Sequence, residues 1–245
     1  MLPARLRALF ISDPLIVLST AFHGTLNLIV DLFGAGEEMQ VRIARHWAKS
    51  LLQVSGVHVT VEGLEKIDTH GSYVFVSNHV SYMDTPVIFT HIPVNFRFLA
   101  KSELFKWPFI GTHLTRARHI SVPLEARAAL KAMADASHTL KARGISLLVF
   151  PEGGRSDTGK LQEFKDGAAY LAIKGGVPLV PIGLIGMHEI LPMHSAIVKT
   201  GRVLLRVGDP IPTDSLKLHD RGRITQELRD RVAELSGQAA YTQTK

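Results

Sequence analysis

The sequence contains no cysteine. Disulfide bonds, thiolate zinc sites and a cysteine nucleophile are therefore excluded, and any covalent chemistry has to use another side chain. The sequence also has no serine in a G-x-S-x-G motif, because the stretch that begins at Gly154, GRSDT, ends one residue short of it. Ser156 is therefore a poor candidate for a nucleophile of that type. The chain offers no evident protein nucleophile.

Acidic residues are fewer than basic ones, since 22 Asp and Glu face 28 Lys and Arg and leave a formal net charge of +6. Such an excess favours an anionic partner, which is a nucleic acid, an anionic membrane surface or a phosphorylated substrate. Signatures of RNA-recognition, zinc-finger and helix-turn-helix domains are absent, and few aromatic residues lie among the basic ones. We therefore expect no nucleic-acid partner.

No linker rich in proline or serine interrupts the 245 residues, of which 46% are hydrophobic. The chain is long and apolar enough to bury one sizeable core. We predict two parts, a helical hairpin over residues 1–56 and an α/β domain over residues 57–245.

The stretch from residue 14 to residue 33, PLIVLSTAFHGTLNLIVDLF, is about as long as a membrane span but is not uniformly apolar. Ser19, His23, Asn27 and Asp31 recur along one helical face. The other face carries Leu15, Leu18, Phe22, Leu26, Ile29 and Phe33. This pattern predicts a helix that lies in the membrane interface or against the domain, rather than one that crosses the bilayer.

A second amphipathic helix is predicted from Glu37 to about Val54, with Gly56 as its stop signal. The two helices would form the hairpin, and we predict that it associates with a membrane surface. The alternative is an ordinary pair of helices that packs in the core.

From Val57 the pattern changes to short strands that alternate with helices as far as Asp209. This alternation predicts an α/β fold, with a mixed sheet flanked by helices. The strands that we expect are 57–61, 73–77, 96–100, 119–122, 145–150, 179–184 and 202–207.

The strand at residues 73–77 stops abruptly at Asn78-His79, and a carboxylate follows at Asp84. In a regular helix, residues five positions apart point to different faces. His79 and Asp84 would meet only if His79 lay in the turn before a helix and Asp84 about one turn inside it. The carboxylate would then accept the Nδ1 hydrogen and leave Nε2 as a general base. The alternative is that His79 is a polar plug and Asp84 a surface charge.

The strand at residues 145–150 leads into the loop Pro151–Ser156, PEGGRS. Its two glycines would let backbone N–H groups approach a ligand, and Arg155 offers a planar fork for a phosphate. Glu152 would buttress the loop, and the alternative is a plain turn. A phosphate-binding G-x-x-x-x-G-K-[ST] motif is not completed here, because Leu161 stands where a hydroxyl is needed.

Four sequence blocks occur in the order typical of one family, between Val74 and Ile182. The pattern N-H-x-x-x-x-D at Asn78 to Asp84 resembles the first signature of the 1-acylglycerol-3-phosphate O-acyltransferase (glycerolipid acyltransferase) family. The other three blocks resemble its later signatures and are KSELFKWPFIG (Lys101–Gly111), FPEGGRS (Phe150–Ser156) and GVPLVPI (Gly176–Ile182).

The resemblance implies transfer of a fatty acyl group from acyl-CoA or acyl carrier protein to a lysophospholipid, with 1-acylglycerol 3-phosphate expected as the acceptor. It implies a membrane-associated protein on the cytoplasmic face of the inner or plasma membrane, with no cofactor and no metal. His79 and Asp84 would be catalytic. The substrate-binding residues would be Lys101, Glu152, Gly153, Gly154 and Arg155, with Arg155 and Lys101 on the acceptor's phosphate and the Gly153 backbone near the reacting carbonyl.

Two positions depart from the family pattern. Leu124 stands where an arginine usually follows the second block, which leaves the acceptor's identity open, and Gly154 replaces a small hydroxylic residue. Acyl transfer to another lysolipid, a lipid-binding protein without catalysis and an esterase therefore remain alternatives. His188 and His194 lie near Glu189 and could mimic a metal site, although loop histidines are usually solvated.

Overall fold

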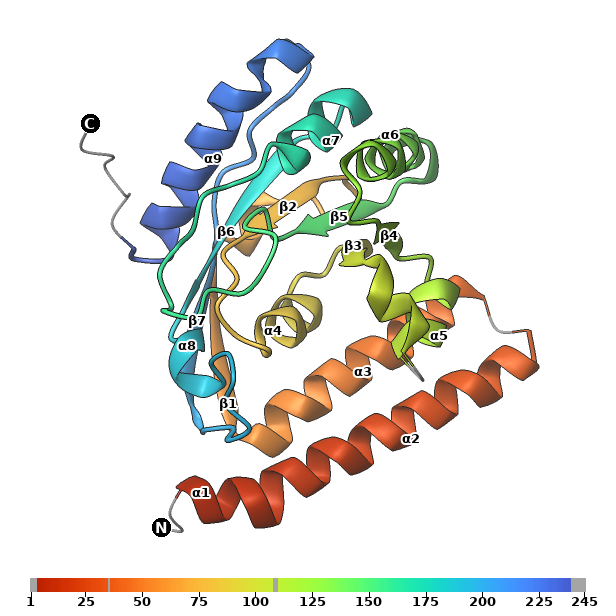
Figure 1. Ribbon diagram of the computed structural model, residues 1–245, viewed down its shortest axis with the longest axis vertical. Coiled ribbons are helices and arrows are strands. Elements are labelled where there is room, and N and C mark those ends of the chain that lie inside the picture. The colour runs from red at the N-terminus through yellow and green to blue at the C-terminus, as the bar shows by residue number, and fades with distance from the viewer. Residues whose placement is uncertain (1–3, 35, 108–109, 239–245) are drawn as a thin grey trace.

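The computed structural model describes residues 4–34, 36–107 and 110–238. Its centre is a seven-stranded sheet with the strand order β1-β7-β6-β2-β5-β3-β4 (Figure 1). The predicted mixed sheet flanked by helices is confirmed, and each strand lies close to its predicted bounds. The strands are β1 (Val57–Glu62), β2 (Val74–Ser77), β3 (Phe96–Lys101), β4 (Ile120–Val122), β5 (Ser146–Val149), β6 (Leu179–Ile185) and β7 (Gly201–Val207).

The direction of the strands determines which loops meet. β2 runs parallel to both of its neighbours, β5 and β6, and β3 runs parallel to β5 and β4. Only β6 and β7 pair antiparallel, and β1 then pairs parallel with β7. The loops that follow β2, β5 and β3 therefore leave from one edge of the sheet, which is where α/β proteins place their ligands.

Helices cover both faces of the sheet (Figure 1). α3 and α4 pack with one face in a first apolar cluster, whereas α6, α7 and α9 pack with the other face in a second. The helices are α1 (Ala4–Arg7), α2 (Asp13–Leu32), α3 (Glu37–Ser55), α4 (Asp84–His91), α5 (Ile110–Arg116), α6 (Ala126–Arg143), α7 (Gly167–Gly175), α8 (Met187–Ile190) and α9 (Arg221–Leu235). A π-helical turn, Ala8–Ser12, joins α1 to α2.

β2 shows why the sheet has an apolar layer on each side. Successive side chains of a strand point to opposite faces. Phe75 lies in the first cluster, whereas Val74 and Val76 lie in the second. All four residues of β2 are buried, so the strand that precedes His79 is held on both sides.

α2 packs on the body through its polar face. Ser19 Oγ is hydrogen-bonded to Ser50 Oγ, and Trp47 Nε1 donates to Thr20 Oγ1 over 3.1 Å. Asp31 pairs with an arginine of α5, whose Nη2 is 3.1 Å from its Oδ2. No side chain of α2 is buried, and its outer face exposes Leu15, Val17, Leu18, Phe22, Ile29 and Leu32. The prediction that this helix lies against the domain is confirmed.

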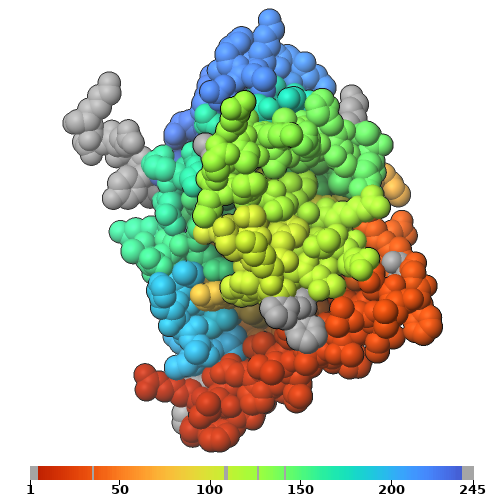
Figure 2. Space-filling view, turned by 45° about the vertical axis from the view of Figure 1, so that its right-hand side comes forward, coloured from red at the N-terminus to blue at the C-terminus, as the bar shows by residue number. Residues whose placement is uncertain are grey.

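The N-terminal helices form the lower side of the molecule in Figure 2. The segment from Arg5 to Leu32 is also long and apolar enough to cross a bilayer by length and composition. α3 differs from α2, because Val41, Ala44, Leu51 and Leu52 are buried in the first cluster. The division into residues 1–56 and 57–245 stays a prediction.

Glu37, the first residue of α3, ties that helix to β3 and α6. Its Oε1 accepts hydrogen bonds from Arg97 Nε, over 3.1 Å, and from Arg97 Nη2. Its Oε2 accepts from Arg143 Nη2 over 2.6 Å. Arg97 is only 1% exposed, and its other compensating partner is Asn95 Oδ1, 2.6 Å from Nη1. A buried guanidinium therefore depends on Glu37 for its counter-charge.

Replacing Glu37 with Ala should lower the free energy of unfolding by about 3 kcal/mol, because it leaves the Arg97 charge buried with only neutral acceptors, Asn95 Oδ1 and the Phe96 carbonyl. Urea denaturation followed by circular dichroism would measure the change. The matched control is Glu38→Ala, an exposed neighbour whose loss should cost less than about 0.5 kcal/mol. Equal effects of the two substitutions would contradict the assignment of Glu37 as the counter-charge of Arg97.

Candidate active site

His79 and Asp84 meet as the sequence predicts. His79 lies in the turn between β2 and α4, and its Nδ1 is 2.8 Å from Asp84 Oδ2. Asp84 is the first residue of α4 rather than one turn inside it, which corrects the predicted position. The turn folds back far enough for the backbone N–H groups of Val80 and Ser81 to donate to the same oxygen, over 2.7 and 2.8 Å.

This arrangement defines the state of the imidazole. Asp84 is fully buried, so its carboxylate is held by hydrogen bonds instead of water. With Nδ1 directed at Asp84, Nε2 is the ring nitrogen left for a substrate, and the His79 side chain is 15% exposed. The ring stacks on Phe150, with centroids 3.9 Å apart and an interplanar angle of 13°. The sequence showed no signal for this stacking, because residues 79 and 150 belong to different loops.

Asn78 does more than terminate the strand. Its side chain donates from Nδ2 to the Leu184 carbonyl over 3.0 Å and accepts the Leu184 N–H at Oδ1 over 2.8 Å. The amide therefore continues the pairing between β2 and β6 past the end of β2. It anchors the backbone immediately before His79, a role that sequence reasoning missed.

Glu152 joins the two site loops, the turn at His79 and the loop Pro151–Ser156. Its Oε1 accepts the backbone N–H of His79 over 2.6 Å, and its Oε2 accepts that of Gln162 over 2.9 Å. In return, Ser156 N–H donates to the His79 carbonyl over 2.8 Å. Both oxygens accept backbone N–H groups, so Glu152 buttresses the loop as expected. Its expected place among the substrate-binding residues gains no support from this geometry.

The environment of Glu152 makes its carboxyl group a weaker acid than usual. Burial raises its pKa to about 7, and the Asp84 charge acts in the same direction. The N–H groups of Gln162 and His79 and the charge of Arg229 oppose this shift without cancelling it.

Gly153 and Gly154 differ in what they offer. Gly153 has a φ of +79°, which favours glycine, and its N–H donates to the Phe150 carbonyl over 3.1 Å. That N–H already donates within the turn. The Gly153 backbone was expected near the reacting carbonyl, but its N–H is not free to bind there. Within the described chain, no acceptor is found for the N–H groups of Gly154 and Arg155. A side chain at Gly154 would meet no atom within 4 Å, so this glycine borders open space.

Arg155 is held by Tyr82, a residue that sequence reasoning did not single out. The guanidinium carbon lies 4.0 Å from the centre of the Tyr82 ring, and Nη1 lies 3.7 Å from Met193 Sδ. No carboxylate pairs with Arg155 among the residues that the structure describes. Its charge is therefore positioned but not neutralised, as an anion-binding arginine requires.

Lys101 is the last residue of β3 and is exposed at the same edge of the sheet as the other site loops. Leu124, the position where the family usually has arginine, is 77% exposed just beyond β4. His194 Nε2 pairs with Asp157 at 3.4 Å. In the described part of the chain, no group of three or more potential ligands could hold a metal ion.

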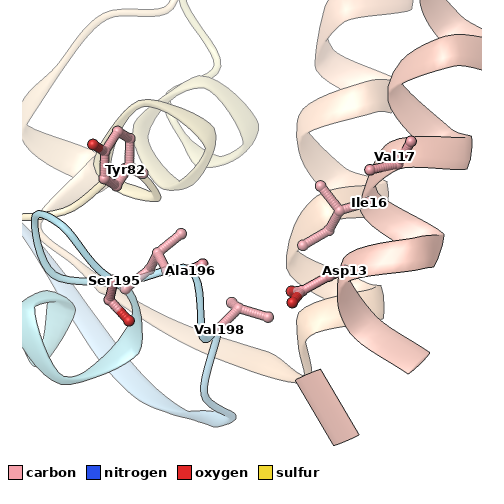
Figure 3. Close-up of a pocket in the computed structure, with 8 residues that line it drawn as sticks. Asp13, Ile16, Val17, Tyr82, Ser195, Ala196 and Val198 are labelled. Atoms are coloured by element: carbon pink, nitrogen blue, oxygen red, sulfur yellow. The ribbon is translucent and has the colours of Figure 1, made fainter. Parts of the chain in front are cut away.

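An apolar pocket of about 330 Å³ lies between α2 and the segment that follows α8. Figure 3 shows Ile16 and Asp13 of α2 facing Val198 and Ala196 across it, with Tyr82 on the far side. Tyr82 therefore borders both this pocket and the Arg155 guanidinium. The polar site and the apolar pocket are adjacent.

Residues 58–185, just over half of the chain, match the acyltransferase family. The chain belongs to the acyltransferase family. The matched part contains His79, Asp84 and the loop from Pro151 to Ser156. The family resemblance predicted from the four sequence blocks is thus confirmed.

Relatives and a solved structure agree with this assignment. A 1-acyl-sn-glycerol-3-phosphate acyltransferase from Cocos nucifera is 30% identical over 167 residues, 68% of this chain and 54% of that protein. One from Limnanthes douglasii is 29% identical over 81% of this chain and 71% of its own length. The chain thus spans about half to 70% of the length of these curated relatives. The crystal structure of the 1-acyl-sn-glycerophosphate acyltransferase PlsC from Thermotoga maritima has a TM-score of 0.77 and 26% identity, covering 96% of this chain and 97% of that one.

The raised pKa of Glu152 should make stability depend on pH. The folded protein holds a proton on Glu152 up to pH about 7, whereas the unfolded chain releases it near 4.5. This contribution is complete below pH 4.5 and is lost as the pH rises toward 7, and it amounts to about 3 kcal/mol. Urea denaturation at pH 5 and pH 8 would measure it.

The control for this measurement is Glu152→Gln, which cannot titrate. His113 and His119 are buried, and burial lowers both of their pKa values, with a nearby arginine adding to the shift. They contribute the opposite slope in both proteins, so the difference between wild type and variant isolates Glu152. If the free energies of unfolding of wild type and variant differed by the same amount at pH 5 and at pH 8, the prediction would be wrong.

Proposed function

We propose that this acyltransferase moves a fatty acyl group from acyl-CoA or acyl carrier protein to the free hydroxyl of 1-acylglycerol 3-phosphate, forming phosphatidic acid. The observation that carries the proposal is the 2.8 Å hydrogen bond between His79 Nδ1 and Asp84 Oδ2, which leaves Nε2 as a base. The relatives from Cocos nucifera and Thermotoga maritima, which are named as acyltransferases for this acceptor, support the proposal.

The proton moves through His79. The acceptor hydroxyl attacks the thioester carbonyl carbon and gives its proton to His79 Nε2, so a carbon–oxygen bond forms and the carbonyl becomes an oxyanion. The tetrahedral intermediate then breaks its carbon–sulfur bond, and the leaving thiolate takes the proton from Nε2. His79 returns to its neutral form. Direct attack needs no protein nucleophile, which suits a chain without cysteine.

Asp84 and the glycine loop support this sequence of steps. The Asp84 carboxylate keeps the Nδ1 hydrogen in place and stabilises the imidazolium that forms between the two proton transfers. The N–H groups of Gly154 and Arg155 have no acceptor among the residues that the structure describes and would stabilise the oxyanion. Arg155, held flat by Tyr82, would bind the acceptor's phosphate, with Lys101 as a further cation at the same edge.

The exposed apolar face of α2 supports docking on a membrane. Val17, Leu18 and Phe22 are 66%, 64% and 64% exposed on the outer side of this helix, whereas its polar side chains face the body. Such a helix lies in the interface of a bilayer with its apolar face among the acyl chains. We place the protein on the cytoplasmic face of the inner or plasma membrane, where thioester donors are made.

Thiol release from acyl-CoA, measured with and without lysophosphatidic acid, tests the reaction. Release that depends on the acceptor is expected for the wild type, and His79→Ala should lower it roughly 10²- to 10⁴-fold, as is typical for loss of a general base. His138→Ala, an exposed histidine on α6, is the matched control and should be unaffected. Release without acceptor would indicate an esterase, and no release would indicate a lipid-binding protein; either result overturns the proposal.

Membrane docking is tested by placing charges on the outer face of α2. Leu18→Glu with Phe22→Glu should lower sedimentation with anionic vesicles about tenfold or more, because each side chain contributes about 1.5–3 kcal/mol when buried in an apolar phase. The control is Leu130→Glu with Leu218→Glu, which alters two exposed leucines elsewhere. If both double variants sediment like the wild type, another surface holds the membrane.

A further inference from the structure

Lys165 is attached to the glycine loop although eight residues separate it from Ser156, where the loop ends. Its backbone N–H donates to the Pro151 carbonyl over 3.0 Å. Its side chain extends over Gly153, where an added Cβ would lie 2.6 Å from Nζ and 3.2 Å from Cε. The ammonium group therefore lies directly against the backbone of the loop that carries Arg155.

Gly153 is required at this point for two separate reasons. Its φ of +79° disfavours any residue with a side chain, and a side chain would also displace the Lys165 ammonium. Gly154 has open space where its side chain would be. The exposed ammonium group of Lys165 thus lies beside a part of the backbone, at Gly154, that has open space next to it.

The acidic residues near Lys165 have other partners. Glu152 turns inward to two backbone N–H groups, Glu163 lies 3.5 Å from Arg229 Nη2, and Asp166 lies 3.4 Å from Arg221 Nε. No ion pair is found for Lys165 itself within the described residues. An unpaired lysine surrounded by paired carboxylates is a site for an anion from outside the chain.

We propose that Lys165 binds the phosphate of the acceptor together with the Arg155 guanidinium. A phosphomonoester carries up to two negative charges and three acceptor oxygens, which one guanidinium does not satisfy. Lys165 would supply a second charge from the α7 side of the loop, whereas Arg155 supplies the first from the Tyr82 side. This inference rests on the proposed function and adds a substrate-binding residue to it.

Steady-state kinetics of Lys165→Met, with lysophosphatidic acid varied at saturating acyl-CoA, tests the inference. The KM for lysophosphatidic acid should rise about tenfold, at the lower end of what a charge-assisted contact provides, while kcat changes less than twofold. Monoacylglycerol, an acceptor without phosphate, should be used equally well by both proteins. Lys165→Arg should restore most of the loss, and Lys160→Met, an exposed lysine of the same loop, is the matched control.

The other outcomes overturn the inference in distinguishable ways. A raised KM for acyl-CoA alone would assign Lys165 to the phosphates of the donor. An equal loss with monoacylglycerol, or a loss of kcat alone, would mean that the lysine only shapes the loop. Wild-type protein without acceptor-dependent turnover would defeat the proposed function itself. Binding of lysophosphatidic acid micelles to wild type and Lys165→Met, measured by calorimetry, would then still decide whether Lys165 binds phosphate.

A double-mutant cycle provides an independent measurement. Gly153→Ala should raise the KM for lysophosphatidic acid, because the new methyl group displaces the ammonium. In a Lys165→Met background the same substitution should raise it by less, since the ammonium group is gone and only the strain at the positive φ of Gly153 remains. Additive effects of the two substitutions would show that Gly153 and Lys165 act separately and would overturn the inference.

Discussion

The site depends on a single carboxylate oxygen. Asp84 Oδ2 accepts hydrogen bonds from the His79 ring and from the N–H groups of Val80 and Ser81. The two backbone bonds shape the turn between β2 and α4, and the ring bond selects the tautomer of His79. One interaction therefore folds the loop and prepares the base. The other carboxylate oxygen, Oδ1, is buried and has no partner in the described part of the chain, so the hydrogen bonding is concentrated on one atom.

The second constraint is the union of two loops that are far apart in sequence. β2 and β5 are neighbours in the sheet, so the turn at His79 and the loop at Glu152 leave side by side. Glu152 accepts the His79 N–H, Ser156 donates to the His79 carbonyl, and Phe150 stacks on the His79 ring. The base and the glycine loop are thereby held as one unit. Burial away from water raises the pKa of the Glu152 carboxyl group, although the two backbone N–H groups that it accepts act in the opposite direction.

The N-terminal helix α2 does not pack in the way that is usual for a surface helix. In a soluble domain the apolar side of such a helix is buried, whereas α2 turns its polar side toward α3 and its apolar side outward. The exposed apolar side is the reason why docking on a bilayer forms part of the proposed function. The pocket beside Tyr82 lies between α2 and the segment that follows α8, next to the polar site.

Local pattern was enough to predict most of the fold and the contact between His79 and Asp84. Strand bounds follow from short apolar runs, and β2 is apolar from Val74 to Val76 because both of its faces are covered. The spacing from His79 to Asp84 allows contact in only one geometry, so it could be predicted apart from the exact position of Asp84 in α4. The polar face of α2 could likewise be read from its four-residue repeat.

Only the tertiary structure decided which groups complete the site. Tyr82 lies over Arg155, Phe150 under His79 and Lys165 over Gly153 because parallel strands bring distant loops to one edge. Nothing in the local sequence of either partner encodes such a contact. For the same reason the sequence could not tell the two glycines apart. The Gly153 N–H was expected to be available, but it donates within the turn, whereas the Gly154 N–H has no acceptor in the described chain. Whether a backbone N–H is free depends on the turn that the chain adopts around it, and that turn is set by strand neighbours remote in sequence.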